Sequence, residues 1–296
     1  MRLSEGYLRA ESIGEAIDAL RAGAENSIVL AGGTVVASLV NQKLLAPSLI
    51  VDISRIKDLR RIERRSGGGL LIGALATHDD VLRSPEIREE CPLLTEIADE
   101  ISCARLRNRG TVGGSLCSVG QQGDMAVGLL ALGAKIKIRG PLGNRAVPIE
   151  EFYSDGFSTV LKPDELLVDV EVSPLPPGAG WAFAKVGPRK AMDYTLVSVA
   201  VTLTRNPSDG AIRTTRIGIN GAAQTAMRPR ETESELVGRQ SDKLDWDRIT
   251  GVLDGEISPP GDLIFSEEYK RHVCSVTVRR CVERALSRTK ERGKEG

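Results

Sequence analysis

The chain has 296 residues, of which 41% are hydrophobic, so it is long enough to form about two domains around a large core. Lys and Arg balance Asp and Glu at 40 each, which excludes a global charge that would attract nucleic acid or an anionic membrane. No apolar stretch approaches the roughly 20 residues that span a bilayer, and the first six residues lack the apolar core of a signal peptide. We therefore expect a cytoplasmic protein.

The first 53 residues predict a small α/β unit. Ser12 and Glu15 have the spacing of a capping box at the start of a helix with an apolar stripe, and Gly23 is a plausible end. An apolar strand over residues 27–30, a glycine-containing loop and a helix over 35–43 follow. A second short strand is expected over 49–53.

Residues 70–139 predict further strands and helices. A strand over 70–75 precedes Thr77, which can cap a helix through Asp80. Helices are expected over 86–101 and 125–132, and the alternating pattern over 135–139 predicts a half-exposed strand.

Three prolines and two glycines within residues 174–180 mark the strongest break in composition. We predict a first domain over residues 1–176, with subdomains of about 1–56 and 57–176. A second domain over 177–290 and a tail over 291–296 follow. The second domain is predicted to be α+β, with a small antiparallel sheet. Its expected strands cover residues 195–204 and 212–219, and its expected helices cover 230–237, 246–253 and 267–286.

Cysteines and histidines are few. The five cysteines contain no Cys-x-x-Cys pair, which argues against iron–sulfur and structural zinc sites on this chain. Cys274 and Cys281 are seven residues apart on an expected helix, so we predict that both face the core. The two histidines, His78 and His272, are expected on the surface. We therefore predict no metal site and no Ser–His–Asp catalytic residues.

Two glycine pairs suggest where a ligand binds. Residues 31–34 (Ala-Gly-Gly-Thr) follow the first apolar strand, and residues 111–115 (Thr-Val-Gly-Gly-Ser) follow three nearby arginines, Arg105, Arg107 and Arg109. Glycine lets the backbone approach an anion closely, and successive N–H groups can hold a phosphate. Either loop alone is more often a simple tight turn. Together they indicate a pyrophosphate held from both sides, and hence a dinucleotide.

The common nucleotide-binding motifs do not explain these loops. A Rossmann site needs Gly-x-Gly-x-x-Gly after a strand, with an acidic residue about 20 positions later, and neither loop matches. The first loop also lacks the Lys-Ser/Thr ending of a P-loop. The dinucleotide must therefore be held in another manner.

The chain resembles the flavin-binding subunit of molybdenum hydroxylases. This family includes the medium subunit of carbon monoxide dehydrogenase and the flavin domain of xanthine dehydrogenase. The resemblance covers about residues 7–288 through short motifs in the family order. These motifs are residues 31–34, 49–53, 72–74, 107–116, 123–124, 161–167, 183–187 with Arg189, 220–223, 228–230 and 269–272.

The resemblance implies an α+β fold: a two-subdomain FAD-binding fold of the PCMH (vanillyl-alcohol-oxidase-like) type, followed by an α+β C-terminal domain with a small antiparallel sheet and helices. It implies that both loops clasp the FAD pyrophosphate. Asp124 would hydrogen-bond the cofactor, whereas Leu167 and Lys185 would lie near the flavin ring. The implied FAD-binding residues are Leu30, Ala31, Gly32, Gly33, Thr34, Val35, Val36, Ala37, Ile101, Thr111, Val112, Gly113, Gly114, Ser115, Asp124, Leu167 and Lys185.

The function implied by the resemblance is electron transfer within a multi-subunit oxidoreductase. A large molybdopterin-binding subunit would oxidise the substrate, and a small subunit with 2Fe–2S clusters would pass the electrons to FAD on this chain. FAD would then reduce an external electron acceptor. The molybdopterin and the iron–sulfur clusters are expected on the partner subunits, which fits the absence of cysteine clusters here.

The sequence departs from the family pattern in both loops. Val35 stands where the family usually has a polar residue, and Ser115 stands where it usually has Asn. Residues 119–122 also replace a stretch that often reads His-Ala-Asp-Pro, and Tyr194 could either stack on the flavin or belong to the core. Two alternatives therefore remain: a self-sufficient flavoprotein oxidoreductase acting on a small substrate, and an assembly subunit with weakened FAD binding.

Overall fold

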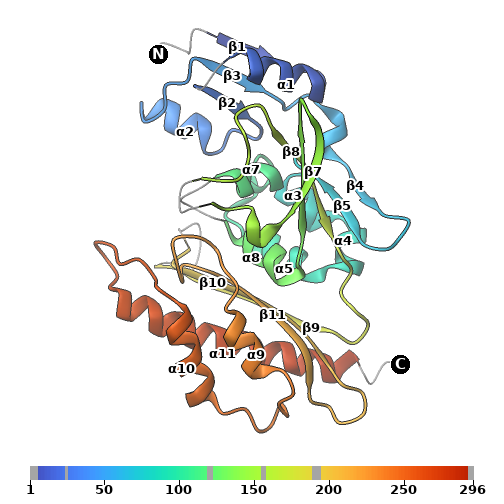
Figure 1. Cartoon of the computed structure of the whole chain (residues 1–296), viewed down its shortest axis with the longest axis vertical. Coiled ribbons are helices and arrows are strands. Elements are labelled where there is room, and N and C mark those ends of the chain that lie inside the picture. Colours follow the sequence, from blue (N-terminus) through green and yellow to red (C-terminus); the bar gives the residue numbers. More distant parts are fainter. Residues whose placement is uncertain (1–5, 24–25, 119–122, 155–157, 189–194, 293–296) are drawn as a thin grey trace.

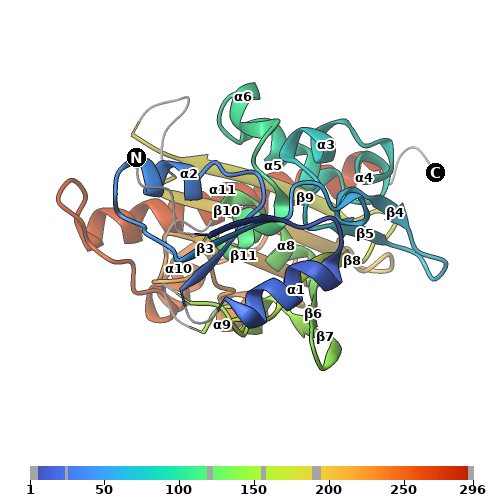
Figure 2. The same ribbon diagram turned by 90° about the horizontal axis from the view of Figure 1, so that it is seen from above.

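The computed structural model describes residues 6–23, 26–118, 123–154, 158–188 and 195–292. Within these ranges the strands form three separate sheets, and the three bodies built on them follow one another along the long axis of the molecule (Figure 1). Seen along that axis, the bodies overlap, so they form a stack (Figure 2). The mixed α+β fold expected from the sequence is confirmed.

The first body is a parallel sheet with the strand order β1-β3-β2 in the described residues. It has the predicted strand–loop–helix–strand unit and an additional first strand that the sequence pattern did not reveal. The oxygen of Ser12 accepts a hydrogen bond from the backbone N–H of Glu15 at 3.1 Å and so caps the first helix. The elements are β1 Gly6–Arg9, α1 Ile13–Ala22, β2 Ser27–Leu30, α2 Val36–Asn41 and β3 Leu49–Asp52.

The second body combines an antiparallel sheet, of strand order β4-β5-β8-β6-β7 in the described residues, with a group of short helices. Its strands are β4 Ile62–Arg64, β5 Leu70–Gly73, β6 Lys135–Gly140, β7 Gly143–Pro148 and β8 Leu166–Val172. Its helices are α3 His78–Arg83, α4 Pro85–Glu90, α5 Pro92–Glu100, α6 Ala104–Arg107, α7 Val112–Cys117 and α8 Asp124–Leu132, with 3₁₀ turns at Lys57–Arg60 and Ile149–Glu151.

The prediction of a single helix over residues 86–101 is wrong, because the chain forms two helices there, α4 and α5. They meet at Cys91, whose backbone leaves the helical region at φ −138° and ψ 57°. The next residue, Pro92, has no N–H to continue α4 and disfavours a helical conformation in the residue before it. Pro92 is instead well suited to the first position of α5.

The third body is the antiparallel sheet β11-β10-β9, covered by helices on both faces. On β10, Ala200 belongs to the core shared with α8, whereas Val199 and Val201 belong to the core shared with α11. β10 is therefore buried along nearly its whole length, including its polar residues Ser198, Thr202 and Thr204. The elements are β9 Gly180–Val186, β10 Val197–Arg205, β11 Ile212–Asn220, α9 Arg230–Leu236, α10 Trp246–Glu256 and α11 Glu267–Arg292.

The two cysteines of α11 face the core, as predicted from the sequence. Cys274 and Cys281 are buried in the core between α11 and the third sheet, and burial raises the pKa of both thiols to about 12. His272 on the same helix is exposed, as expected. These thiols are therefore inert packing groups at neutral pH.

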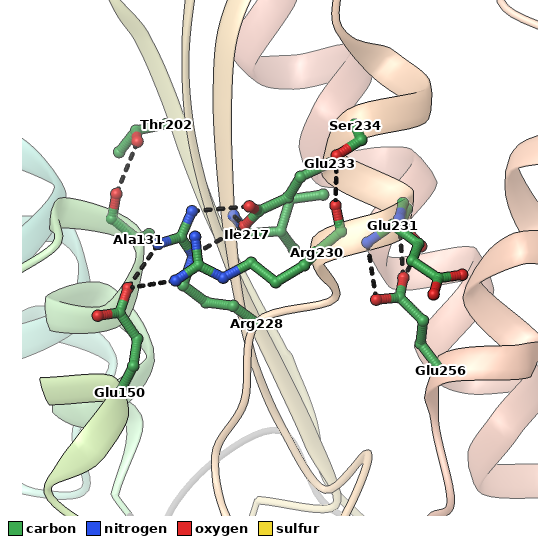
Figure 3. Close-up of polar contacts among 11 residues, drawn as sticks. Ala131, Glu150, Thr202, Ile217, Arg228, Arg230, Glu231, Glu233, Ser234 and Glu256 are labelled. Carbon is green, nitrogen blue, oxygen red and sulfur yellow. Dashed lines mark hydrogen bonds and ion pairs between the residues drawn. The ribbon is translucent and has the colours of Figure 1, made fainter.

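Close contact of α8 with β10 and β11 joins the second and third bodies. The Thr202 hydroxyl donates a hydrogen bond to the backbone oxygen of Ala131 at 2.8 Å. At Gly218 the two backbones come so close that a Cβ would lie 2.2 Å from the oxygen of Val127. On another side of the same contact, Arg228 connects Glu150 of the second body with Glu233 of α9 (Figure 3).

The contact at Gly218 gives a testable prediction. Gly218→Ala should destabilise the chain by about 1–3 kcal/mol, because the added methyl group must push α8 away from β11. Gly251→Ala in α10 is the matched control: nothing lies within 4 Å of its Cβ position, so a gain of about 0.4–1 kcal/mol is expected. Chemical denaturation measures both. Equal effects of the two substitutions would contradict the close packing described here.

Candidate functional site

A cavity of about 520 Å³ lies where the two glycine loops meet, between the first and second bodies. Its volume is within the range of about 300–1,000 Å³ that is typical of ligand sites. Residues of both loops and of the segment that leads into β8 line it. The lining residues are Ile28, Val29, Ala31, Gly32, Gly33, Thr34, Val35, Val36, Leu39, Ile53, Ala74, His78, Gly110, Thr111, Gly113, Gly114, Ser115, Cys117, Ser118, Leu161, Glu165, Leu166 and Leu167.

The two loops touch each other directly at one side of this cavity. A Cβ on Gly32 would lie 1.7 Å from the backbone oxygen of Arg109, so only glycine permits this approach. The Arg109 guanidinium in turn donates a hydrogen bond to the backbone oxygen of Gly32 at 3.2 Å. Gly33 has φ +76°, a conformation that side chains disfavour. The first glycine pair is therefore required by the backbone geometry.

The first loop offers free hydrogen-bond donors to the cavity. The backbone N–H groups of Gly32, Gly33 and Thr34 have no acceptor in the part of the chain that the structure describes, and neither does the Thr34 hydroxyl. Consecutive free N–H groups in such a turn form an anion-binding concavity. This loop therefore has the backbone geometry for holding a phosphate.

The second loop is built differently, because the protein itself uses its backbone N–H groups. Gly113 donates to the oxygen of Ala74 at 2.9 Å, and Gly114 donates to the Thr111 hydroxyl at 3.0 Å. A Cβ on Gly113 would lie 2.7 Å from the Cβ of Ala74, so this glycine is required by packing. The Ser115 hydroxyl has no partner among the described residues. The second loop thus supplies a wall and a hydroxyl, whereas the first supplies the N–H cradle.

The charged groups at the cavity do not oppose an anionic ligand. Glu165 is held by two hydrogen bonds from the Arg145 guanidinium at 2.6 and 2.9 Å, and these bonds lower the pKa of Glu165. Its charge is therefore compensated within the protein. Among the described residues no group of three or more His, Cys, Asp or Glu side chains could hold a metal ion.

His78 corrects one expectation from the sequence. It was expected on the surface, but it is only 5% exposed and lines the cavity. Its backbone N–H donates to the oxygen of Gly110 at 3.0 Å, which places the imidazole beside the start of the second loop. Burial lowers the pKa of His78 to about 4, and the charge of Asp124 acts in the opposite direction. The sequence offered no signal for this placement except the capping box that starts α3.

A second polar group lies beside the cavity and contains two of the predicted residues, Asp124 and Lys185. The Lys185 ammonium is 3.3 Å from an Asp124 carboxylate oxygen and also donates to the backbone oxygen of Glu100, next to Ile101. The Thr195 hydroxyl donates to the other Asp124 oxygen at 3.0 Å. Ser115 of the second loop lies next to this group. A Cβ built on Gly123, the residue before Asp124, would be 2.6 Å from the Ser115 hydroxyl oxygen.

The cavity thus brings together most of the residues predicted from the sequence, but not all. Those outside its lining are Leu30, Ala37, Ile101, Val112, Asp124 and Lys185. The first two flank the first loop, and Val112 is buried within the second loop. Asp124 and Lys185 form the adjacent polar group, and Ile101 follows Glu100, whose backbone oxygen accepts a hydrogen bond from Lys185. Residues 119–122 and Tyr194, which the sequence analysis also considered, lie outside the described residues.

Comparison with known proteins agrees with this geometry. Residues 2–175 match the FAD binding domain in molybdopterin dehydrogenase, and residues 182–285 match the CO dehydrogenase flavoprotein C-terminal domain. The chain is 32% identical over 284 residues to the 6-hydroxypseudooxynicotine dehydrogenase complex subunit alpha of Paenarthrobacter nicotinovorans, covering 96% of this chain and 95% of that protein. It is also 32% identical over 284 residues to the carbon monoxide dehydrogenase medium chain of Afipia carboxidovorans, covering 96% and 97%.

A solved structure is similar over almost the same length. A chain of the reconstituted CO dehydrogenase from Oligotropha carboxidovorans superimposes with a TM-score of 0.91 at 29% identity, covering 97% of this chain and 99% of that one. Both domain matches, the curated relatives and the structural likeness lead to the same conclusion. The chain belongs to the family of FAD-binding medium subunits of molybdopterin-dependent dehydrogenases.

Proposed function

We propose that FAD binds in the cavity between the two glycine loops, with its pyrophosphate at the first loop. The observation that carries this assignment is the row of free N–H groups at Gly32, Gly33 and Thr34, which faces a cavity bordered by the second loop. The Thr34 and Ser115 hydroxyls add two further free polar groups. Val35 replaces a polar residue of the family pattern and Ser115 replaces Asn, but both substitutions leave this backbone cradle intact.

The protein binds and orients the cofactor, and the cofactor supplies the redox chemistry. FAD can accept two electrons and release them singly or in pairs. The buried side chains of Leu166 and Leu167, at the start of β8, exclude water from one side of the cavity. Asp124 and Lys185 neutralise each other beside it, so in this proposal they border the cofactor without forming part of the phosphate cradle.

Assembly into a multi-subunit oxidoreductase is characteristic of the family, since relatives are named as medium chains or as subunits of complexes. In our proposal this chain receives electrons from 2Fe–2S clusters on a small subunit, which in turn receives them from a large molybdopterin-binding subunit. An external acceptor then takes them from FAD. Among the described residues no helix is long and apolar enough to cross a membrane. The proposed location is the cytoplasm.

The function is tested by removing FAD from the assembled complex. The flavin-free complex should still reduce its iron–sulfur clusters with substrate but should no longer reduce the external acceptor, and added FAD should restore that step. Acceptor reduction at an unchanged rate without FAD would contradict the electron-transfer role. Turnover of a small substrate by the isolated, FAD-loaded chain would instead favour the self-sufficient flavoprotein alternative.

A further inference from the structure

His78 is a buried polar side chain whose hydrogen bonds the protein does not complete. It is 5% exposed, it lines the cavity, and neither ring nitrogen has a hydrogen-bond partner among the described residues. The Nδ1 atom is fully enclosed and without a partner, whereas Nε2 is not fully enclosed, so Nε2 is the ring nitrogen that a ligand in the cavity can reach. Buried polar groups in folded proteins nearly always have a partner, so one that lacks it beside a cavity points to a bound ligand.

The position of the ring is fixed by its surroundings. The backbone N–H of His78 bonds to Gly110, and a Cβ on Gly110 would lie 3.0 Å from the imidazole. Thr77 caps the helix that begins with His78 through a complete capping box with Asp80. The imidazole is therefore held at the point where the second loop begins, facing the same cavity as the free N–H groups of the first loop.

We propose that His78 binds FAD directly, through a hydrogen bond between its imidazole and a polar atom of the cofactor. This inference rests on the proposed function. A neutral imidazole carries one N–H donor and one acceptor nitrogen, and FAD offers phosphate and hydroxyl oxygens that suit either. Burial keeps the ring neutral at physiological pH, because it lowers the pKa of His78 to about 4 against the opposing charge of Asp124. His78 therefore adds a side-chain contact at the start of the second loop to the backbone cradle of the first.

Replacing the imidazole separates a binding role from a packing role. In titrations of the flavin-free full-length chain with FAD, His78→Leu should raise the Kd about tenfold to a hundredfold, the range expected for loss of a hydrogen bond to a charged or polar ligand. His78→Gln retains a donor and an acceptor, so its Kd should lie between those of His78→Leu and the unsubstituted chain. The flavin-free His78→Leu chain should be at least as resistant to denaturant as the unsubstituted chain, because it no longer buries an unpaired polar group.

The chain provides its own control, because its only other histidine is the exposed His272. His272→Gln should bind FAD as the unsubstituted chain does. In the chain labelled with ¹⁵N at histidine, FAD should shift the His78 imidazole signals and leave those of His272 in place. Unchanged FAD affinity in His78→Leu, or unmoved His78 signals on FAD binding, would overturn the inference. Failure of the unsubstituted chain to bind FAD would overturn the proposed function itself.

Discussion

Gly32→Ala is expected to abolish tight FAD binding. The added Cβ would lie 1.7 Å from the backbone oxygen of Arg109, far inside any permitted contact, and a backbone atom cannot rotate away as a flexible side chain can. The two loops must therefore separate, and the free N–H groups of residues 32–34 must move with them. Because several hydrogen bonds to the pyrophosphate would be lost together, the Kd for FAD should rise by roughly a hundredfold or more.

Gly67→Ala is the matched control for this prediction. Nothing lies within 4 Å of a Cβ on Gly67, which is in the turn between β4 and β5, away from the cavity lining. FAD titration monitored by flavin fluorescence measures both variants, and circular dichroism shows whether each retains its secondary structure. Wild-type affinity in Gly32→Ala would show that contact between the two loops is unnecessary for holding the cofactor.

Arg228→Met should produce the largest loss of stability. The Arg228 side chain is 4% exposed and makes ion pairs with Glu233 at 2.7 Å and with Glu150 at 2.5 Å (Figure 3). Glu233 is also buried and accepts the backbone N–H of Ile217 at 2.7 Å, so removing the guanidinium leaves a buried carboxylate without its counter-charge. Breaking one side of a buried pair typically costs about 3–5 kcal/mol, which corresponds to a drop in Tm of about 10 °C.

Arg230→Met tests whether burial is the reason for that loss. Arg230 pairs with the same Glu150 at 3.2 Å, but its side chain is 60% exposed, so its removal should cost less than about 1 kcal/mol. Thermal unfolding of the two variants under identical conditions gives the comparison. A Tm loss for Arg230→Met as large as that for Arg228→Met would show that burial of the Arg228–Glu233 pair does not govern stability here.

Local sequence signals predicted much of the fold. The apolar stripes and capping sequences of α1 and α3 depend on neighbouring residues. Thr77 and Asp80 form the complete capping box of α3, whereas at α1 Ser12 caps Glu15 but the Glu15 carboxylate accepts the N–H of Glu11. The break at Cys91 was also encoded locally, in Pro92, but the apolar residues on both sides of it suggested one continuous helix. The domain boundary predicted near residue 176 stays a prediction, although the chain between β8 and β9 forms neither helix nor strand.

The details of the site depend on contacts between distant segments, so the sequence could not reveal them. The pattern 111–115 identified a second glycine loop, but its N–H groups bond to oxygens of residues 74 and 76 and to Thr111. The burial of His78 likewise results from Gly110, which lies far along the chain. A histidine at the first position of a helix is ordinarily exposed, and only the packing of the second loop over it changes its environment.

The location of FAD is the central claim, and hydrogen–deuterium exchange of the full chain with and without FAD tests it most directly. We expect FAD to slow exchange in residues 31–37 and 110–118 and in the segment leading into β8, because these segments border the cavity. Exchange at Ala223, Gln224, Thr225 and Ser258, which line a separate cavity between the second and third bodies, should not change. Protection at that second cavity, with none at the glycine loops, would contradict the account.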